Sequence, residues 1–156
     1  MIELHQISGL MLEAAPGAQS RWDEHIEYWN GEKAGDYNDI GEFAHYVVDG
    51  YEKGETAEFD AIFQVIERLI IEGNDETQGV AIVGFLEDVQ NISSHREFGE
   101  SVFVPYLRPK SREAWNALTT FWEGKSSLED AIRAEALSGE SLKSPNGNAT
   151  NPPLPQ

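Results

Sequence analysis

The sequence predicts an all-α fold, a single domain of stacked antiparallel helices built from HEAT-like helical hairpins. Apolar residues recur at spacings of three and four in one segment after another, which is the pattern of helices with one buried face. Gly, Asn and Pro stand between these segments, where helices end. From Ser138 on, small and helix-breaking residues leave little to bury, which predicts a helical domain over 1–137 and a disordered, flexible tail over 138–156.

The first two predicted helices cover 4–15 and 19–29. The first ends at Pro16, and the second ends at Asn30 and Gly31, which are typical of helix termini. Within the second, apolar side chains fall on one stripe, which favours core positions for its two tryptophans over interface positions. The residues of that stripe are Trp22, Ile26 and Trp29.

The next two predicted helices cover 36–51 and 57–71, separated by Gly54. Thr56 precedes the second of them and is expected to cap it through its hydroxyl. This helix has the broadest apolar face in the chain, so we expect it at the centre of the core. The face comprises Phe59, Ile62, Phe63, Ile66, Leu69 and Ile70.

A fifth helix is predicted over 75–92, capped by Asn74, and it forms an antiparallel hairpin with the helix before it. Its apolar run over 80–83 also fits a short buried strand, although the pattern that continues to Val89 favours a helix.

The remaining elements are shorter. A short segment over 98–107 contains Pro105, which disfavours a long helix. A helix over 112–122 is expected to end at Gly124, and Ser126 with Glu129 resembles a capping box that begins a last helix to 137.

Acidic residues dominate the charge of the chain. Asp and Glu number 28 against 11 Lys and Arg, which gives a formal net charge of −17. Such a charge repels nucleic acid and anionic membranes and accelerates encounters with basic proteins. The simpler interpretation, in which the acidity only keeps the protein soluble, is equally compatible with the composition.

The start of the chain has no basic stretch followed by an apolar run, and no apolar segment approaches the ~20 residues of a membrane span. We therefore expect a cytoplasmic protein that binds neither nucleic acid nor membrane. Cysteine is absent, which excludes disulfides and thiolate sites.

Three histidines are candidates for catalysis or metal binding. Glu42 and His45 form a Glu-x-x-His pair, but a di-iron site needs a second copy, so a surface pairing is favoured. His25 stands among acidic residues, which favours a position on an acidic face over a role as catalytic base. His95 follows Ser93 and Ser94, without the strand–turn–helix elbow of a nucleophilic serine.

No phosphate-binding glycine motif occurs either. The sequence therefore favours a protein that is not an enzyme and that has no metal and no cofactor.

The stretch 21–30 interleaves large aromatic residues with carboxylates. Trp and Tyr are favoured interface anchors, and carboxylates facing Arg or Lys set register and association rate. We expect a partner-binding surface formed by acidic residues in this region, namely Asp23, Glu24, Glu27, Asp36, Asp39 and Glu42.

Several motifs resemble a family of small, acidic, helical bacterial proteins encoded near polymorphic toxins. They are VAIVGFLEDVQN at 80–91, LRPKSREAW at 107–115 and FWEG at 121–124, together with 59–72. The resemblance covers roughly 36–125 and implies an immunity protein that binds a cognate toxin domain and blocks its active site. It transfers no catalytic residue, and core motifs of this kind report fold better than function.

The leading hypothesis is thus an immunity protein whose partner is a basic toxin domain. One alternative is an acidic mimic of nucleic acid that inhibits a DNA-binding protein, which needs carboxylates at phosphate-like spacing along one face. Another is an enzyme that uses a His and a carboxylate in a cleft.

Overall fold

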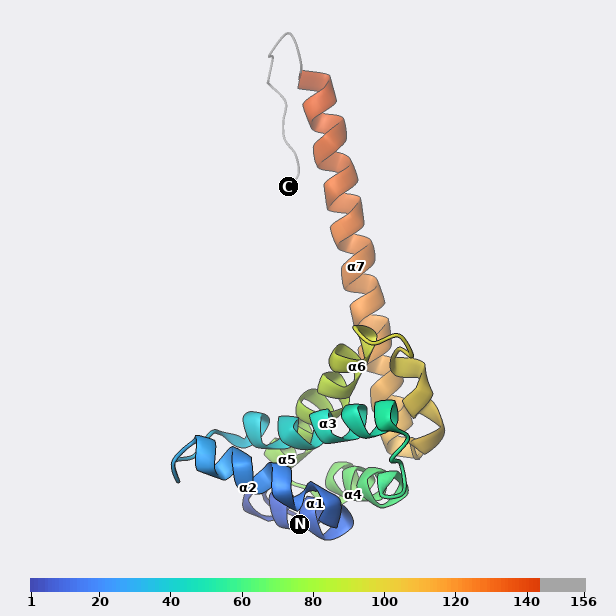
Figure 1. Ribbon diagram of the computed structural model, residues 1–156. Helices are drawn as coiled ribbons and strands as arrows, with labels where there is room; N and C mark the ends of the chain where they lie inside the picture. Colours follow the sequence, from blue (N-terminus) through green and yellow to red (C-terminus); the bar gives the residue numbers. More distant parts are fainter. Residues whose placement is uncertain (144–156) are drawn as a thin grey trace. The chain divides into compact units, whose positions relative to one another are not determined.

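The computed structural model of the protein describes residues 1–143; within the last helix, nothing is described for the side chains of 126–127, 129–130 and 135–143. Over the described residues, every named secondary-structure element is a helix, which confirms the predicted all-α class of packed helices (Figure 1). The chain divides into two compact units, Met1–Asn116 and Ala117–Gln156, and each is described by itself. The predicted boundary between domain and tail at 137 stays a prediction.

The first unit contains short 3-10 turns between longer α-helices. In chain order its elements are η1 (Leu4–Gln6), α1 (Ile7–Ala14), η2 (Pro16–Ala18), α2 (Gln19–Tyr28), α3 (Asp36–Lys53), α4 (Phe59–Glu72), α5 (Asp75–Gly79), the π-helical η3 (Val80–Leu86), α6 (Glu87–Ser94), η4 (Glu100–Tyr106) and the start of α7 (Pro109–Lys143).

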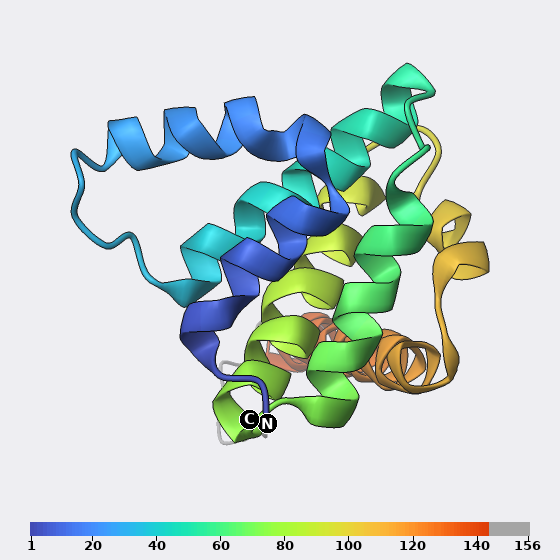
Figure 2. The same ribbon diagram turned by 90° about the horizontal axis from the view of Figure 1, so that it is seen from below.

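The predicted hairpin is present, because α4 is followed by a continuous helical segment made of α5, η3 and α6 that runs back beside it (Figure 2). Asn74 caps α5 as expected, and its side-chain oxygen accepts a hydrogen bond of 2.9 Å from the backbone N–H of Thr77. The alternative of a strand over 80–83 is wrong, since this stretch is π-helical. Gly84 allows η3 to approach α3 closely, because a Cβ there would lie 2.7 Å from Cγ2 of Ile40.

Helix α3 is central to the first unit. It packs against η3 and α6 on one side and against α1 and α2 on another. The core around it is rich in phenylalanine, and Phe63 meets Phe85 edge to face with ring centroids 5.6 Å apart. Burying each such ring stabilises the fold by roughly 1.5–3 kcal/mol, because apolar surface is removed from water. The fully buried rings are Phe43, Phe59, Phe63, Phe85 and Phe103.

Two sequence-based expectations in this unit are wrong. Helix α4 begins at Phe59 with Glu58 at the N-cap, so Thr56 does not cap it. The carboxylate of Glu58 accepts hydrogen bonds from Tyr46 and Gly17 instead, which holds the preceding turn against α3 and η2. Trp22 and Trp29 are half-buried and not core residues.

Helix α7 continues without a break from Pro109 to Lys143, so the predicted end at Gly124 and the new start at Ser126 are wrong. Gly124 does not adopt the positive φ that lets Gly54 end α3, and a helix tolerates such a glycine at a cost of about 1 kcal/mol. The helix also continues past Ser138, and the rest of the predicted tail, 144–156, lies outside the described residues.

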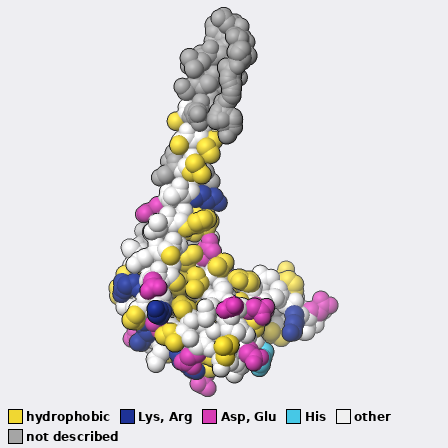
Figure 3. Space-filling model, turned by 180° about the vertical axis from the view of Figure 1, so that it is seen from behind, with side chains coloured by type: hydrophobic (Ala, Val, Ile, Leu, Met, Phe, Trp, Pro, Cys, Tyr) yellow, Lys and Arg dark blue, Asp and Glu magenta, His cyan; other side chains and the backbone are white. Residues whose placement is uncertain are grey.

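In the second unit, large apolar side chains of α7 are exposed (Figure 3). Phe121, the first residue of the FWEG motif, is 61% exposed. Among the described residues, no helix combines the length and the apolar character that crossing a membrane requires.

Candidate functional site

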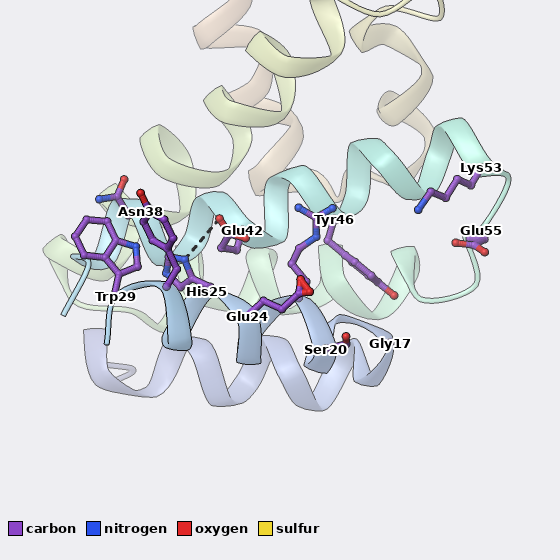
Figure 4. A pocket seen from close by; sticks show the side chains of 12 residues that line it. Gly17, Ser20, Glu24, His25, Trp29, Asn38, Glu42, Tyr46, Lys53 and Glu55 are labelled. Carbon is purple, nitrogen blue, oxygen red and sulfur yellow. Dashed lines mark ion pairs between the residues drawn. The ribbon is translucent and has the colours of Figure 1, made fainter. Parts of the chain in front are cut away.

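A groove of about 990 Å³ lies between α2 and α3 (Figure 4). The connection between the two helices turns back because Asn30, Gly31 and Gly35 have positive φ, a conformation that Asn and Gly adopt most readily. Helix α3 therefore returns beside α2. The groove is lined by Glu24, His25 and Tyr28 from α2 and by Asn38, Glu42 and Tyr46 from α3, among others.

His25 joins the two helices at the floor of the groove. Its Nε2 lies 2.8 Å from Oδ1 of Asp39, and its Nδ1 lies 3.7 Å from Oε2 of Glu42. Its ring also packs 5.4 Å from that of Trp22, and only 6% of its side chain is exposed. Because both ring nitrogens face carboxylates of α3, the imidazole serves to hold α2 in place.

A chain of ion pairs fixes the same two helices further along. Arg21 of α2 donates to Oδ2 of Asp49 at 2.6 Å, and Arg96 donates to Oδ1 of the same carboxylate at 3.0 Å. Arg96 also pairs with Glu52 at 2.6 Å. Partial burial raises the pKa of Asp49, but the hydrogen bonds and charges of Arg96 and Arg21 outweigh this and hold it below its usual value.

Tyr46 closes the other side of the groove. Its hydroxyl donates to Glu58, and the same carboxylate accepts a hydrogen bond of 2.9 Å from the backbone N–H of Gly17. Burial, and then the hydrogen bond and charge of Glu58, raise the pKa of Tyr46 to about 12. Gly17 suits this contact because any Cβ there would collide with the Tyr46 hydroxyl.

The six predicted interface acids are not gathered in one place. Asp39 and Glu42 converge on His25, and Glu24 lines the groove beside them. Asp23 and Glu27 are exposed on α2 and do not line the groove, and Asp23 accepts a hydrogen bond of 2.9 Å from Gln19.

The sixth acid, Asp36, lies at the first turn of α3 and is exposed. Together with Asp39 it lines a smaller pocket of about 250 Å³ that also includes Lys33 and His5.

The outer side of α2 differs from the sequence-based expectation. Ile26, assigned to the buried stripe, is 42% exposed, and Tyr28 is 82% exposed, whereas His25 is buried. Both His25 and Ile26 stand three to four residues from Trp22 and Trp29, so spacing alone allows either to face α3. His25, and not Ile26, faces α3 because acidic residues of α3 pair with its imidazole.

Arg21, Tyr46 and Asp49 also shape the groove and were not among the predicted site residues. Arg21 and Asp49 are 28 positions apart along the chain, and Tyr46 and its partner Glu58 are 12 apart. No local sequence pattern indicates such pairings.

The remaining candidates are His45 and the two serines that precede His95. His45 is exposed. Burial raises the pKa of the Asp88 carboxyl, and the charge of His45 partly opposes this effect. Ser93 is fully buried and donates its hydroxyl to the carbonyl of Val89, while Ser94 donates to the carbonyl of Asn91. In the part of the chain that the structure describes, no three acidic or histidine side chains are placed to hold a metal ion.

Comparison with curated proteins and with solved structures finds no match to this chain. A family described as a domain of unknown function, DUF7674, matches residues 9–123. The matched span contains both helices of the groove, and it begins upstream of the stretch 36–125 that carries the resemblance to immunity proteins. Since the match covers most of the sequence, the chain belongs to the DUF7674 family.

Proposed function

We propose that this protein works by binding a basic protein partner through its α2–α3 surface, and that the partner is a bacterial toxin domain whose active site it blocks. The α2–α3 surface is defined here as the groove between the two helices, the exposed side of α2 and the exposed first turn of α3, which carries Asp36. The resemblance to immunity proteins supports a toxin as the partner, and the geometry of α2 and α3 supports this surface as the binding site.

One observation carries the proposal: α2 turns apolar side chains outward and a histidine inward. Ile26 and Tyr28 are exposed, while His25 is buried against α3. A helix whose only role was to cover a core would place these side chains the other way round. Exposed aromatic and aliphatic side chains beside polar ones are typical of the anchors of protein interfaces.

The charges on this surface favour a cationic partner. Glu24 and Glu27 are exposed on α2, and neither forms an ion pair among the described residues. The net charge of −17 adds a long-range attraction that accelerates the approach of a basic protein. Both effects would serve a protein that must bind its partner quickly.

The histidine in the groove supports binding better than catalysis. A general base needs one ring nitrogen free to meet the proton that it removes. In His25, Nε2 is hydrogen-bonded to Asp39, and only 6% of the side chain is exposed, so little of the ring is open to a substrate. This arrangement favours a binding protein over an enzyme that uses this cleft.

The arrangement of the acids also bears on the alternative of a nucleic-acid mimic. On the face seen in Figure 3, acidic side chains of the first unit are interleaved with apolar ones and form no continuous row. A phosphate mimic needs a regular series of carboxylates, and this face, seen from behind the view of Figure 1, does not present one.

The proposal is tested by co-expressing this protein with a basic toxin domain encoded beside its gene. We expect the toxin alone to arrest growth, and the pair to grow and to purify as a stoichiometric complex. A test variant replaces four acids of the α2–α3 surface, Asp23, Glu24, Glu27 and Asp36, with Asn or Gln, which should weaken protection. Equal toxicity with and without this protein would refute the proposal.

A further inference from the structure

The groove between α2 and α3 has carboxylates on both walls and aromatic rings at one end. Glu24 projects from α2 and Glu42 from α3, while Trp29 and Asn38 lie together at the end where α2 stops (Figure 4). Tyr28 lines the same groove and meets Trp29 edge to face, with ring centroids 5.8 Å apart. Charge and aromatic surface therefore lie side by side in one concave site.

The cations of the groove are already paired or lie at its other end. Arg21 donates to Asp49 at 2.6 Å, and Lys53 lies with Glu55 at the end opposite Trp29 (Figure 4). The carboxylate of Glu42 stands 3.7 Å from Nδ1 of His25, which is longer than a hydrogen bond, so its oxygens can still accept donors.

These features suit one kind of side chain in particular. A guanidinium group is planar, carries five donors that match carboxylates, and stacks on aromatic rings. A lysine ammonium group is also attracted by the carboxylates, but it stacks less well on aromatic rings and forms no bidentate contact with a carboxylate. The groove also reaches the upper end of the volumes of ligand pockets, so it has room for the backbone that carries the side chain.

We propose that the groove receives an arginine side chain of the basic partner, with its guanidinium between Glu24 and Glu42 and against the ring of Tyr28. This inference rests on the proposed function, since the arginine belongs to the bound protein. Such a site would distinguish arginine from lysine, which net charge alone cannot do because both side chains carry one positive charge.

The test compares the binding of labelled octa-arginine and octa-lysine to the full chain by fluorescence anisotropy at one ionic strength. Both peptides carry the same number of charges, so surface attraction alone gives them similar affinities. We expect octa-arginine to bind about fivefold more tightly, a difference typical of stacking on an exposed aromatic ring. Equal affinities, or no measurable binding of either peptide, would overturn the inference.

Three variants test whether the preference for arginine over lysine arises in the groove. Glu24→Gln and Tyr28→Leu change exposed side chains that line the groove, and each should remove most of the preference for arginine. Asp23→Asn makes the same charge change as Glu24→Gln on the same helix but outside the groove, so it should weaken both peptides equally. A preference that survives in both groove variants would also overturn the inference.

These outcomes are separate from those of the protection experiment. If arginine is not preferred but the basic domain still binds and is neutralised, only the inference about the groove fails. If arginine is preferred but the protein gives no protection, the proposed function fails and the groove keeps its selectivity.

Discussion

His25 of α2 and Asp39 of α3 lie 2.8 Å apart, Nε2 to Oδ1, and this contact joins the two helices that form the groove. Helix α2 has no other buried side chain, so polar and aromatic contacts, rather than an apolar face, hold it on α3. Ile26 and Tyr28 of α2 are thereby left exposed.

Removing this contact should loosen α2. We expect His25→Ala to lower the free energy of unfolding by about 1–3 kcal/mol, because a buried hydrogen bond to a carboxylate and the packing on Trp22 are both lost. Urea denaturation measures the change. His5→Ala is the control, since the side chain of His5 is 77% exposed and its loss should have little effect. Equal losses in the two variants would contradict the role given to His25.

Asp49 should make the stability of the protein depend on pH. Its pKa is lowered in the folded state, so the unfolded chain binds the proton more tightly. The stabilisation is therefore fully present above the unfolded-state pKa of about 3.9 and is lost as the pH falls through the lower folded-state pKa.

Asp49→Asn removes this dependence. Urea denaturation at a series of pH values should show a stability difference between wild type and variant that is largest near neutrality and shrinks below about pH 4. A difference that stays constant over the whole acidic range would show that the two arginines do not act on this carboxylate as described.

Gly84 and Gly9 provide a matched pair of glycine substitutions. In Gly84→Ala the new Cβ would lie 2.7 Å from Ile40, so η3 and α3 must separate, at a cost of about 1–3 kcal/mol. In Gly9→Ala nothing lies within 4 Å, and the variant should be more stable by up to about 1 kcal/mol through helix propensity. Thermal unfolding of both variants checks the opposite signs. A Gly84→Ala protein as stable as wild type would contradict the close packing of η3 on α3.

Gly124→Ala distinguishes a continuous α7 from a helix that ends at this residue. In a continuous helix the alanine meets no atom within 4 Å and should raise helicity and slow hydrogen exchange in the surrounding turns. At a helix end with a left-handed glycine, the same change would be unfavourable. Faster exchange around residue 124 would therefore support the break that the sequence pattern suggests.

Local patterns in the sequence predict most of the helices of the fold. Apolar spacing identified α3 and α4 with their buried faces, and Asn74 was recognised as a cap because its role depends only on the next three residues. Gly54 was recognised as the end of α3 for the same reason, since its left-handed backbone is a local requirement.

Features that depend on distant residues were not predictable in this way. Glu67 illustrates this, because its buried carboxylate accepts hydrogen bonds of 2.8 Å from the backbone N–H groups of Lys110 and Ser111 at the start of α7. The orientation of α2 is a second case, since the pairing of His25 with Asp39 decides between two stripes that local spacing allows equally. Two of the six predicted interface acids, Asp39 and Glu42, consequently also serve the fold.

The central claim, that the α2–α3 surface binds a basic protein, is tested most directly by association kinetics. Stopped-flow binding to the neighbouring basic domain would compare wild type with the variant Asp23→Asn, Glu24→Gln, Glu27→Gln and Asp36→Asn. A control with the same change in charge replaces exposed acids elsewhere, namely Asp60, Glu97, Glu100 and Glu113. We predict that the α2–α3 variant associates at least about tenfold more slowly than the control and shows a weaker dependence on salt. Equal association rates for the two variants would contradict the claim.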